Sequence, residues 1–215
     1  MRIAVINEVS CCARNKDIVN ALQNRGHEII NLGMKNEEGE PVLTYMETGF
    51  LTGVVLNLGA ADLVIGGCGT GIGYANAVMQ YPGVICGLME TPLDAWMFIQ
   101  INAGNCISLP LNKGYGWGSD EKLIEIFDQL LRMDLWEHGY PEHRRESEIE
   151  TRKQLMCVSL ANHYDFETLL DRMNVAEPTI ITKSLHFPGI SDFISNVPCT
   201  NKSLQRLLVT KYLTH

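Results

Sequence analysis

Five short apolar runs alternate with longer amphipathic segments over roughly the first 135 residues. Each run has the length of a buried strand, and the segments between the runs have the apolar spacing of helices. The expected strands are Ile3–Ile6, Glu28–Leu32, Leu63–Gly67, Val84–Leu88 and Cys106–Leu109, and the expected helices lie near 14–25, 44–58, 74–80, 91–101 and 119–133. Apolar strands that alternate with helices predict a parallel sheet that is covered on both faces.

The fold class that follows is α/β, a doubly wound, five-stranded parallel sheet of the Rossmann-like or flavodoxin-like kind. In such sheets the ligand crevice lies beyond the carboxyl ends of the strands, near a switch in strand order. Chemistry is therefore expected in the residues that follow the strands. These are Asn7 and Glu8, Cys68 to Thr70, Met89 and Glu90, and the loop 102–113.

The sequence pattern changes after about residue 134. Residues 142–153 are highly charged and lead into a helical pattern that continues to Met173, whereas the last forty residues contain three prolines and no long periodic run. We predict a boundary near 150, with 1–150 as the α/β domain and 151–215 as a mostly helical C-terminal extension. Its last part is expected to be irregular, and the extension packs on the domain or a second copy, or acts as a lid. Five apolar side chains are expected to become buried in this way: Leu155, Val158, Leu160, Leu169 and Leu170.

Composition argues against several classes of protein. A net charge of −8 and a pI near 5.2 disfavour a broad surface for nucleic acid or an anionic membrane. The chain has neither an apolar leader nor a run of roughly 20 apolar residues. Its seven cysteines include no CxxC pair, which disfavours a disulfide framework or a structural zinc site. We expect a cytoplasmic protein that binds no nucleic acid, membrane or metal.

A glycine-rich turn is the strongest functional signal. Residues 62–73 read DLVIGGCGTGIG, with glycine at every second position from 67 to 73, directly after an expected buried strand. Closely spaced glycines let a backbone approach a ligand and point several N–H groups at one anion. The turn therefore predicts a site for a phosphate or an enediolate oxygen, with Cys68 at its mouth. The alternative is a turn that only permits tight packing of strand against helix.

Three other glycine-loop signatures do not fit. A nucleoside-triphosphate loop needs Lys followed by Ser or Thr after its last glycine, and a dinucleotide fingerprint follows the first strand with the spacing GxGxxG. Neither pattern is present around residues 67–73, and no arginine follows Cys68 within a few residues as a phosphatase loop requires.

The CGTGIG turn at 68–73, followed by a short helix and Pro82-Gly83-Val84, resembles the ribose-5-phosphate isomerase B family, which includes the galactose-6-phosphate isomerase subunits. The resemblance covers about residues 2–150 and includes the segment GHEIINLG at 26–33, the NAGN loop at 102–105 and the arginine pair at 144–145. It makes 1–150 a sugar-phosphate isomerase-like domain. Residues 151–215 have no counterpart in this resemblance.

The resemblance implies an isomerase that interconverts aldose and ketose phosphates through an enediolate, without metal or organic cofactor. Cys68 matches the position of the catalytic base. Four residues match the turn that cradles the enediolate oxygens: Gly69, Thr70, Gly71 and Gly73. The substrate would be a phosphorylated sugar, and the protein a homodimer, or a tetramer, with its sites at the subunit interface.

Further candidate contacts follow from the same resemblance. Asn102 and Asn105 match two asparagines of a family loop, although Asn-Ala-Gly-Asn also suits an ordinary turn. Lys113 lies near a family arginine that contacts phosphate. Arg145, with Arg144 as its alternative, matches a basic segment that reaches phosphate across the dimer interface; a solvated helix face is the other interpretation.

Two positions depart from the family pattern. The family's first strand ends in Asp-His, whereas this one ends in Asn7-Glu8, so that Glu8 is the candidate substrate contact there. The ring-opening histidine aligns with Ile101, which cannot exchange a proton. His138 and His143 are the nearest replacements in sequence.

These departures leave two other functions open. One is a non-catalytic or regulatory protein that binds sugar phosphates without turnover. The other is a thiol-dependent hydrolase or redox protein that uses a reactive cysteine at position 68.

Overall fold

The computed structural model describes residues 1–39, 41–132 and 136–213. Five parallel strands form one sheet in the order β2–β1–β3–β5–β4. Their bounds are β1 Arg2–Asn7, β2 Glu28–Asn31, β3 Leu63–Cys68, β4 Cys86–Leu88 and β5 Cys106–Pro110. The prediction of a doubly wound α/β fold is confirmed. The expected strand at Val84–Leu88 is shorter than predicted, because pairing with β5 begins only at Cys86.

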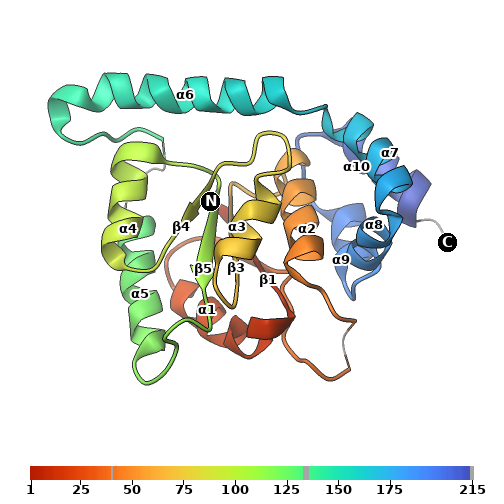
Figure 1. Cartoon of the computed structure of the whole chain (residues 1–215), viewed down its shortest axis with the longest axis horizontal. Helices are drawn as coiled ribbons and strands as arrows, with labels where there is room; N and C mark the ends of the chain where they lie inside the picture. The colour runs from red at the N-terminus through yellow and green to blue at the C-terminus, as the bar shows by residue number, and fades with distance from the viewer. Residues whose placement is uncertain (40, 133–135, 214–215) are drawn as a thin grey trace.

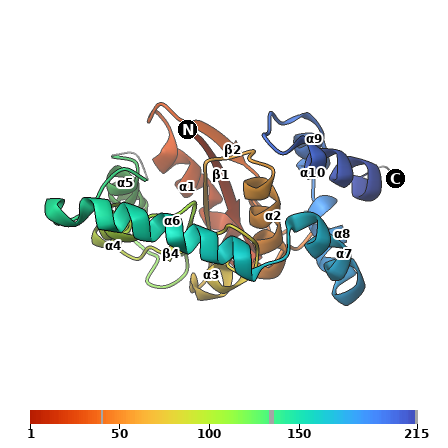
Figure 2. The same ribbon diagram turned by 90° about the horizontal axis from the view of Figure 1, so that it is seen from above.

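Helices cover both faces of the sheet (Figures 1 and 2). On one face lie α1 (Asn15–Leu22), α4 (Pro92–Met97) and α5 (Ser119–Leu130), packed on side chains such as Ile3 and Val5. On the other lie α2 (Tyr45–Asn57) and α3 (Ile72–Val78), packed on side chains such as Ala4 and Ile6. Successive residues of β1 thus enter different cores, as the two-residue period of a strand requires. A 3-10 segment (Val9–Arg14) follows β1, and a π-helical turn (Phe98–Asn102) extends α4.

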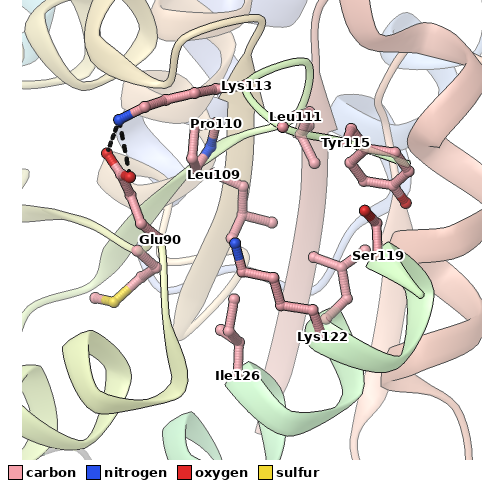
Figure 3. Close-up of a pocket in the computed structure, with 12 residues that line it drawn as sticks. Glu90, Leu109, Pro110, Leu111, Lys113, Tyr115, Ser119, Lys122 and Ile126 are labelled. Atoms are coloured by element: carbon pink, nitrogen blue, oxygen red, sulfur yellow. Dashed lines mark hydrogen bonds and ion pairs between the residues drawn. The ribbon is translucent and has the colours of Figure 1, made fainter. Parts of the chain in front are cut away.

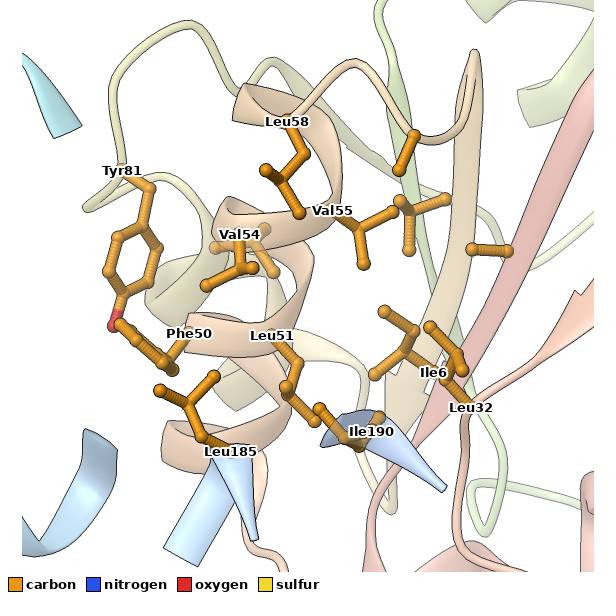
Figure 4. Close-up of a cluster of buried hydrophobic side chains, with 14 of the residues drawn as sticks. Ile6, Leu32, Phe50, Leu51, Val54, Val55, Leu58, Tyr81, Leu185 and Ile190 are labelled. Atoms are coloured by element: carbon orange, nitrogen blue, oxygen red, sulfur yellow. The ribbon is translucent and has the colours of Figure 1, made fainter. Parts of the chain in front are cut away.

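Helix α2 begins at a capping box and is buried on most of its surface. The Thr44 side chain accepts from the backbone of Met46, and the Glu47 carboxylate accepts from the Thr44 backbone N–H at 2.8 Å. One side of α2 packs on the sheet. Its other side packs on Leu185 and Ile190 of the C-terminal region, which join Phe50 and Leu51 in one apolar cluster (Figure 4).

The C-terminal region is helical up to residue 213, so the prediction of an irregular last part is wrong. Its helices are α6 Arg145–Asn162, α7 Phe166–Ala176, α8 Pro178–Leu185, α9 Ile190–Asn196 and α10 Lys202–Leu208, followed by a π-helical turn at Val209–Leu213. Pro178 occupies the first turn of α8, where its missing N–H costs nothing. Pro188 and Pro198 lie between helices. The prolines therefore divide the region into short helices rather than preventing helix formation.

Helix α6 crosses the end of the sheet at which β4 and β5 begin and leads to α7 and α8 (Figures 1 and 2). The side chain of Arg152 is 2% exposed and donates to the carbonyls of Ile99, Gln100 and Ile101 at 2.6–3.2 Å.

The burial expected for the five apolar side chains of the C-terminal region is only partly observed. Leu170 is buried and Leu169 partly buried, but the expectation is wrong for Leu155, Val158 and Leu160, which are 48%, 52% and 53% exposed. Helix α6 lies across the end of the sheet, so only one side of the helix faces the sheet and the side chains on its other sides stay exposed.

Candidate active site

The candidate site lies where β1 and β3 end. From β1 the chain moves to β2 on one side and then returns to β3 on the other, so the switch in strand order falls between β1 and β3. Asn7 and Gly67 are register partners on these two strands, and Cys68 follows as the last residue of β3. The structure therefore brings Glu8 and Cys68 to the crevice that this topology creates.

The glycine turn reverses the chain directly after Cys68. Cys68 is 5% exposed, and its thiol lies 3.8 Å from the hydroxyl of Thr70. Gly67 packs so closely on β5 that a Cβ there would overlap the Leu109 carbonyl, and Gly71 has φ 75°, a left-handed conformation that favours glycine. At these two positions the sequence pattern is therefore a structural requirement as well as a candidate ligand cradle.

Some backbone N–H groups of the glycine turn are already hydrogen-bonded within the turn. Gly71 donates to the Cys68 carbonyl at 3.3 Å, and Ile72 donates to the Thr70 hydroxyl at 3.3 Å. Within the described parts of the chain, the backbone N–H groups of Gly69 and Thr70 have no acceptor. An oxyanion at this turn would therefore meet two available amides rather than the whole set from 69 to 73.

Glu8 is buried next to the turn, at 4% exposure. Its carboxylate caps the 3-10 segment by accepting from the Ser10 backbone N–H at 3.1 Å, and it also accepts from the Ser10 hydroxyl. Ser10 in turn lies against Gly69, and its carbonyl accepts from the Asn112 amide at 2.7 Å. Glu8 therefore joins the end of β1 to the glycine turn and to the loop after β5.

A second thiol lies beside the same turn. Cys11 is fully buried and is 3.6 Å from the Gly67 carbonyl and 3.3 Å from the Glu8 carbonyl. Burial, reinforced by the Glu8 carboxylate, raises the pKa of the Cys11 thiol well above its ordinary value. Cys11 is therefore a neutral neighbour of the turn at physiological pH.

Lys113 also lies at the carboxyl edge, in a pocket below the ends of β4 and β5 (Figure 3). Its ammonium binds both carboxylate oxygens of Glu90, at 2.7 and 2.9 Å. Lys122 extends from α5 into the same pocket. Glu90 is a sequence-predicted candidate because it follows an expected strand. Nothing in the sequence pattern indicates that it pairs with Lys113 or that Lys122 enters the same pocket.

Asn102 and Asn105 lie at the opposite edge of the sheet, because they precede β5. The Asn105 carbonyl accepts from Val64, four residues before Cys68, which is about 13 Å along a strand. The Asn105 side chain accepts from Ile85 at 2.9 Å and donates to Gly83 at 2.8 Å. Within one chain, Asn105 thus ties the beginnings of β4 and β5 together.

Arg144 and Arg145 also lie away from the glycine turn of their own chain. They stand at the start of α6, whose contacts are with residues that precede β4 and β5. Arg145 donates to the Glu137 carbonyl at 2.8 Å and pairs with Glu142 at 3.6 Å. The predicted site residues thus divide into a carboxyl-edge set and an amino-edge set.

The part of the chain that the structure describes contains neither a metal-binding cluster of side chains nor a membrane-spanning helix. No group of three or more His, Cys, Asp or Glu side chains in this part of the chain is arranged to hold a metal ion. No helix there is both long and apolar enough to cross a bilayer.

The fold and this edge define a class: a doubly wound α/β protein with a thiol in a glycine cradle at its topological switch point. Residues 3–148 match the family model of the ribose/galactose isomerases. The chain therefore belongs to this family of sugar isomerases.

Solved structures extend the similarity beyond the family model. A 4-deoxy-L-threo-5-hexosulose-uronate ketol-isomerase, complexed with a tartrate, is 35% identical over 98% of each chain, with a TM-score of 0.89. A ribose-5-phosphate isomerase from Vibrio parahaemolyticus is 30% identical over 97% of each chain, with a TM-score of 0.87. A ribose 5-phosphate isomerase from Thermotoga maritima, 24% identical with a TM-score of 0.57, covers 71% of this chain and 97% of its own length. A search of curated sequences found no match.

The coverage corrects the expectation for residues 151–215. The two relatives that align over nearly their whole length include the C-terminal helices, so this region does have a counterpart among them.

Proposed function

We propose that this chain is an aldose–ketose isomerase that acts on an acidic sugar through a cis-enediolate, with Cys68 as the base. The observation that carries the proposal is the place of the Cys68 thiol, at the end of β3 inside the glycine turn and at the switch point of the sheet. Membership of a sugar isomerase family supports the reaction type.

The reaction moves one proton between neighbouring carbons. The Cys68 thiolate takes the proton from C2 of the aldose, and the C2–H electron pair forms the C1=C2 bond of the enediolate while the carbonyl oxygen O1 becomes an oxyanion. The proton then returns to C1, and the O2 hydroxyl proton passes to O1. C1 is reduced and C2 oxidised within the same molecule, so the step needs no external oxidant or reductant.

The available N–H groups of Gly69 and Thr70 supply the stabilisation that the oxyanion requires. The Thr70 hydroxyl, 3.8 Å from the thiol, is placed to donate to the second enediolate oxygen. Gly71 and Gly73 keep the turn open to the substrate: Gly73 faces the Tyr45 ring, which a Cβ would approach to 3.2 Å.

The acidic end of the substrate needs a cation. Lys113 is at the carboxyl edge, and Arg144 and Arg145 are at the amino edge of the same chain. We therefore propose a homodimer in which the amino-edge set of one copy, including Asn102, meets the carboxyl-edge set of the other.

Two acidic sugar classes are candidates. A phosphorylated sugar corresponds to the ribose-5-phosphate isomerases among the relatives. A sugar uronate is the second candidate, because the full-length relative with 35% identity is a uronate ketol-isomerase. An open-chain substrate of either class would not need a ring-opening histidine at the position of Ile101.

The test compares wild type with Cys68→Ala and with Cys157→Ala, a control on the exposed face of α6. Turnover is followed with pentose and hexose phosphates and with sugar uronates, as ketose formation and as solvent deuterium uptake at C1 and C2. Loss of the base should lower turnover at least about 100-fold while binding is retained, and the control should be unchanged. Wild-type protein that binds these sugars but neither converts nor exchanges them would favour the binding-protein alternative, for which Ile101 is the specific observation.

A further inference from the structure

The pocket below the ends of β4 and β5 is a separate feature from the glycine turn. Its walls are apolar, formed by side chains such as Met89, Leu109 and Leu123. Its charged groups are Glu90, Lys113 and Lys122, which come from the segment after β4, the loop after β5 and α5 (Figure 3). An apolar pocket with a few convergent charges is the usual form of a site for one end of a small ligand.

The two lysines of this pocket differ in their partners. Lys113 is engaged by both oxygens of Glu90. The ammonium of Lys122 makes no hydrogen bond or ion pair with any other residue that the structure describes, and it extends across the pocket toward β5 (Figure 3). Lys122 is therefore the cation that is available to an anionic ligand.

The charge of the pocket matches a single negative charge. Two ammonium groups and one carboxylate sum to +1. A carboxylate carries one negative charge, whereas a phosphate monoester carries about −1.5 to −2 at pH 7. Because Glu90 lines the same pocket, it would repel the second charge of a phosphate at close range.

The small size of the pocket also favours a carboxylate over a phosphate. Its cavity volume is about 20 Å³. That volume is close to the space that one water molecule occupies, on the order of 10–15 Å³ by this measure. A carboxylate is smaller and flatter than a tetrahedral phosphate with three outer oxygens, so the pocket walls would have to move less to admit it.

We propose that this pocket binds the carboxylate of a sugar acid, with Lys122 as the binding cation and Glu90 as the residue that selects a single negative charge. The inference rests on the proposed isomerase function for the position of the reacting carbons. Pro110, in the pocket wall, is the register partner of Cys68, so the two lie about 5 Å apart across adjacent strands. Leu111, also in the wall, donates its N–H to the Cys68 carbonyl at 3.0 Å. The pocket therefore lies at the same edge of the sheet as Cys68, on the face that α5 covers, whereas Cys68 packs with the apolar cluster on the other face. A sugar anchored in the pocket would have to extend over the end of β5 to bring its carbons to the thiol.

Calorimetric titration of the full-length protein tests the proposal with three probes: D-galacturonate, D-galactose 6-phosphate and neutral D-galactose. The variants are Lys122→Met, Lys122→Arg and Glu90→Gln, with Lys153→Met on α6 as the control. Wild type should bind galacturonate most tightly. Lys122→Met should weaken that binding about tenfold or more, as for a lost hydrogen bond to a charged group, and Lys122→Arg should retain most of it. Glu90→Gln should shift the preference toward the phosphate, and Lys153→Met should match wild type.

The proposal is overturned if wild type prefers the phosphate, if it does not bind galacturonate, or if Lys122→Met binds galacturonate as wild type does. These are equilibrium constants and do not depend on turnover. Lys122-dependent binding of galacturonate without any isomerisation would therefore contradict the proposed reaction and support this site. If the protein isomerises a sugar phosphate and the Lys122→Met variant does so equally well, the proposed reaction is supported and this site is contradicted.

Discussion

At the scale of single residues, the cysteines have clearly different surroundings. Cys68 lies in the glycine turn next to a hydroxyl and two available amides. Cys11 is packed beside that turn, and its raised pKa keeps it protonated. Cys106, on β5, is fully buried with its thiol 3.9 Å from the Tyr74 hydroxyl of α3, and Cys157 is exposed on α6. Reactivity toward an alkylating reagent should therefore separate these positions.

We predict that iodoacetamide at pH 8 modifies Cys157 at a rate that sugars do not change, and Cys68 at a rate that a bound sugar lowers. Cys11 and Cys106 should react only when the protein unfolds, Cys11 because its thiolate is disfavoured and Cys106 because it is enclosed. Mass-spectrometric mapping of each cysteine over time measures these rates. Modification of Cys68 that is as slow as that of Cys106, or is unaffected by every sugar tested, would contradict the role of base.

The sequence predicts some of these residues and not others, for a physical reason. The Cys68 turn is a local feature: glycine spacing after a buried strand determines where the thiol lies. The Lys113–Glu90 pair and the position of Lys122 depend on how the segment after β4, the loop after β5 and α5 pack together. No local sequence pattern contains that information. The sequence does predict that Asn102 and Asn105 lie away from Cys68. Both precede β5, and residues that precede a parallel strand lie at its amino end, whereas Cys68 ends β3.

At the scale of elements, α6 is attached to the α/β domain mainly through a buried arginine. Arg152 donates to three carbonyls at the end of the π-helical turn Phe98–Asn102. The end of a helix is where backbone carbonyls need donors from outside the helix. Glu148, also buried, accepts from the Tyr140 backbone N–H at 2.8 Å. These polar contacts take the place of an apolar seam between α6 and the sheet.

Replacing this arginine should therefore weaken the whole molecule. Arg152→Met removes the side-chain donors of three backbone carbonyls and should lower the free energy of unfolding by about 3 kcal/mol. Lys153→Met, the exposed neighbour, should change it by no more than about 0.5 kcal/mol. Urea unfolding followed by circular dichroism measures both variants. Equal stability of the two variants would mean that α6 is held by other contacts.

The short helices of the C-terminal region are not predicted by the sequence pattern. The α/β elements follow regular apolar periods, which predict their positions to within a few residues. In the last forty residues, helices of seven or eight residues are too short to show a sustained period, and prolines at their boundaries resemble loop signals. Burial in one apolar cluster with α2 stabilises these helices, and the contact of α8 with α2 spans more than 100 residues of sequence.

At the scale of the whole molecule, the predicted site residues occupy two opposite edges of one sheet. Cys68, Thr70, Glu8 and Lys113 lie at the carboxyl edge, whereas the two asparagines and the arginine pair lie at the amino edge. A single chain cannot bring the two sets onto one small sugar, because the length of the strands separates them. If both sets act on the substrate, each site must be assembled from two copies.

Mixing two defective variants tests this arrangement directly. Cys68→Ala and Arg145→Ala, unfolded together and refolded, should give a mixture in which half of the dimers contain one copy of each. Each of these dimers has one site with both groups intact, so activity should return to about a quarter of wild type. The control mixes Cys68→Ala with Lys113→Ala, whose groups belong to the same edge of one chain, and should show no gain over Lys113→Ala alone. Equal behaviour of the two mixtures, or a monomer by sedimentation, would show that the arginine acts within its own chain or not at all.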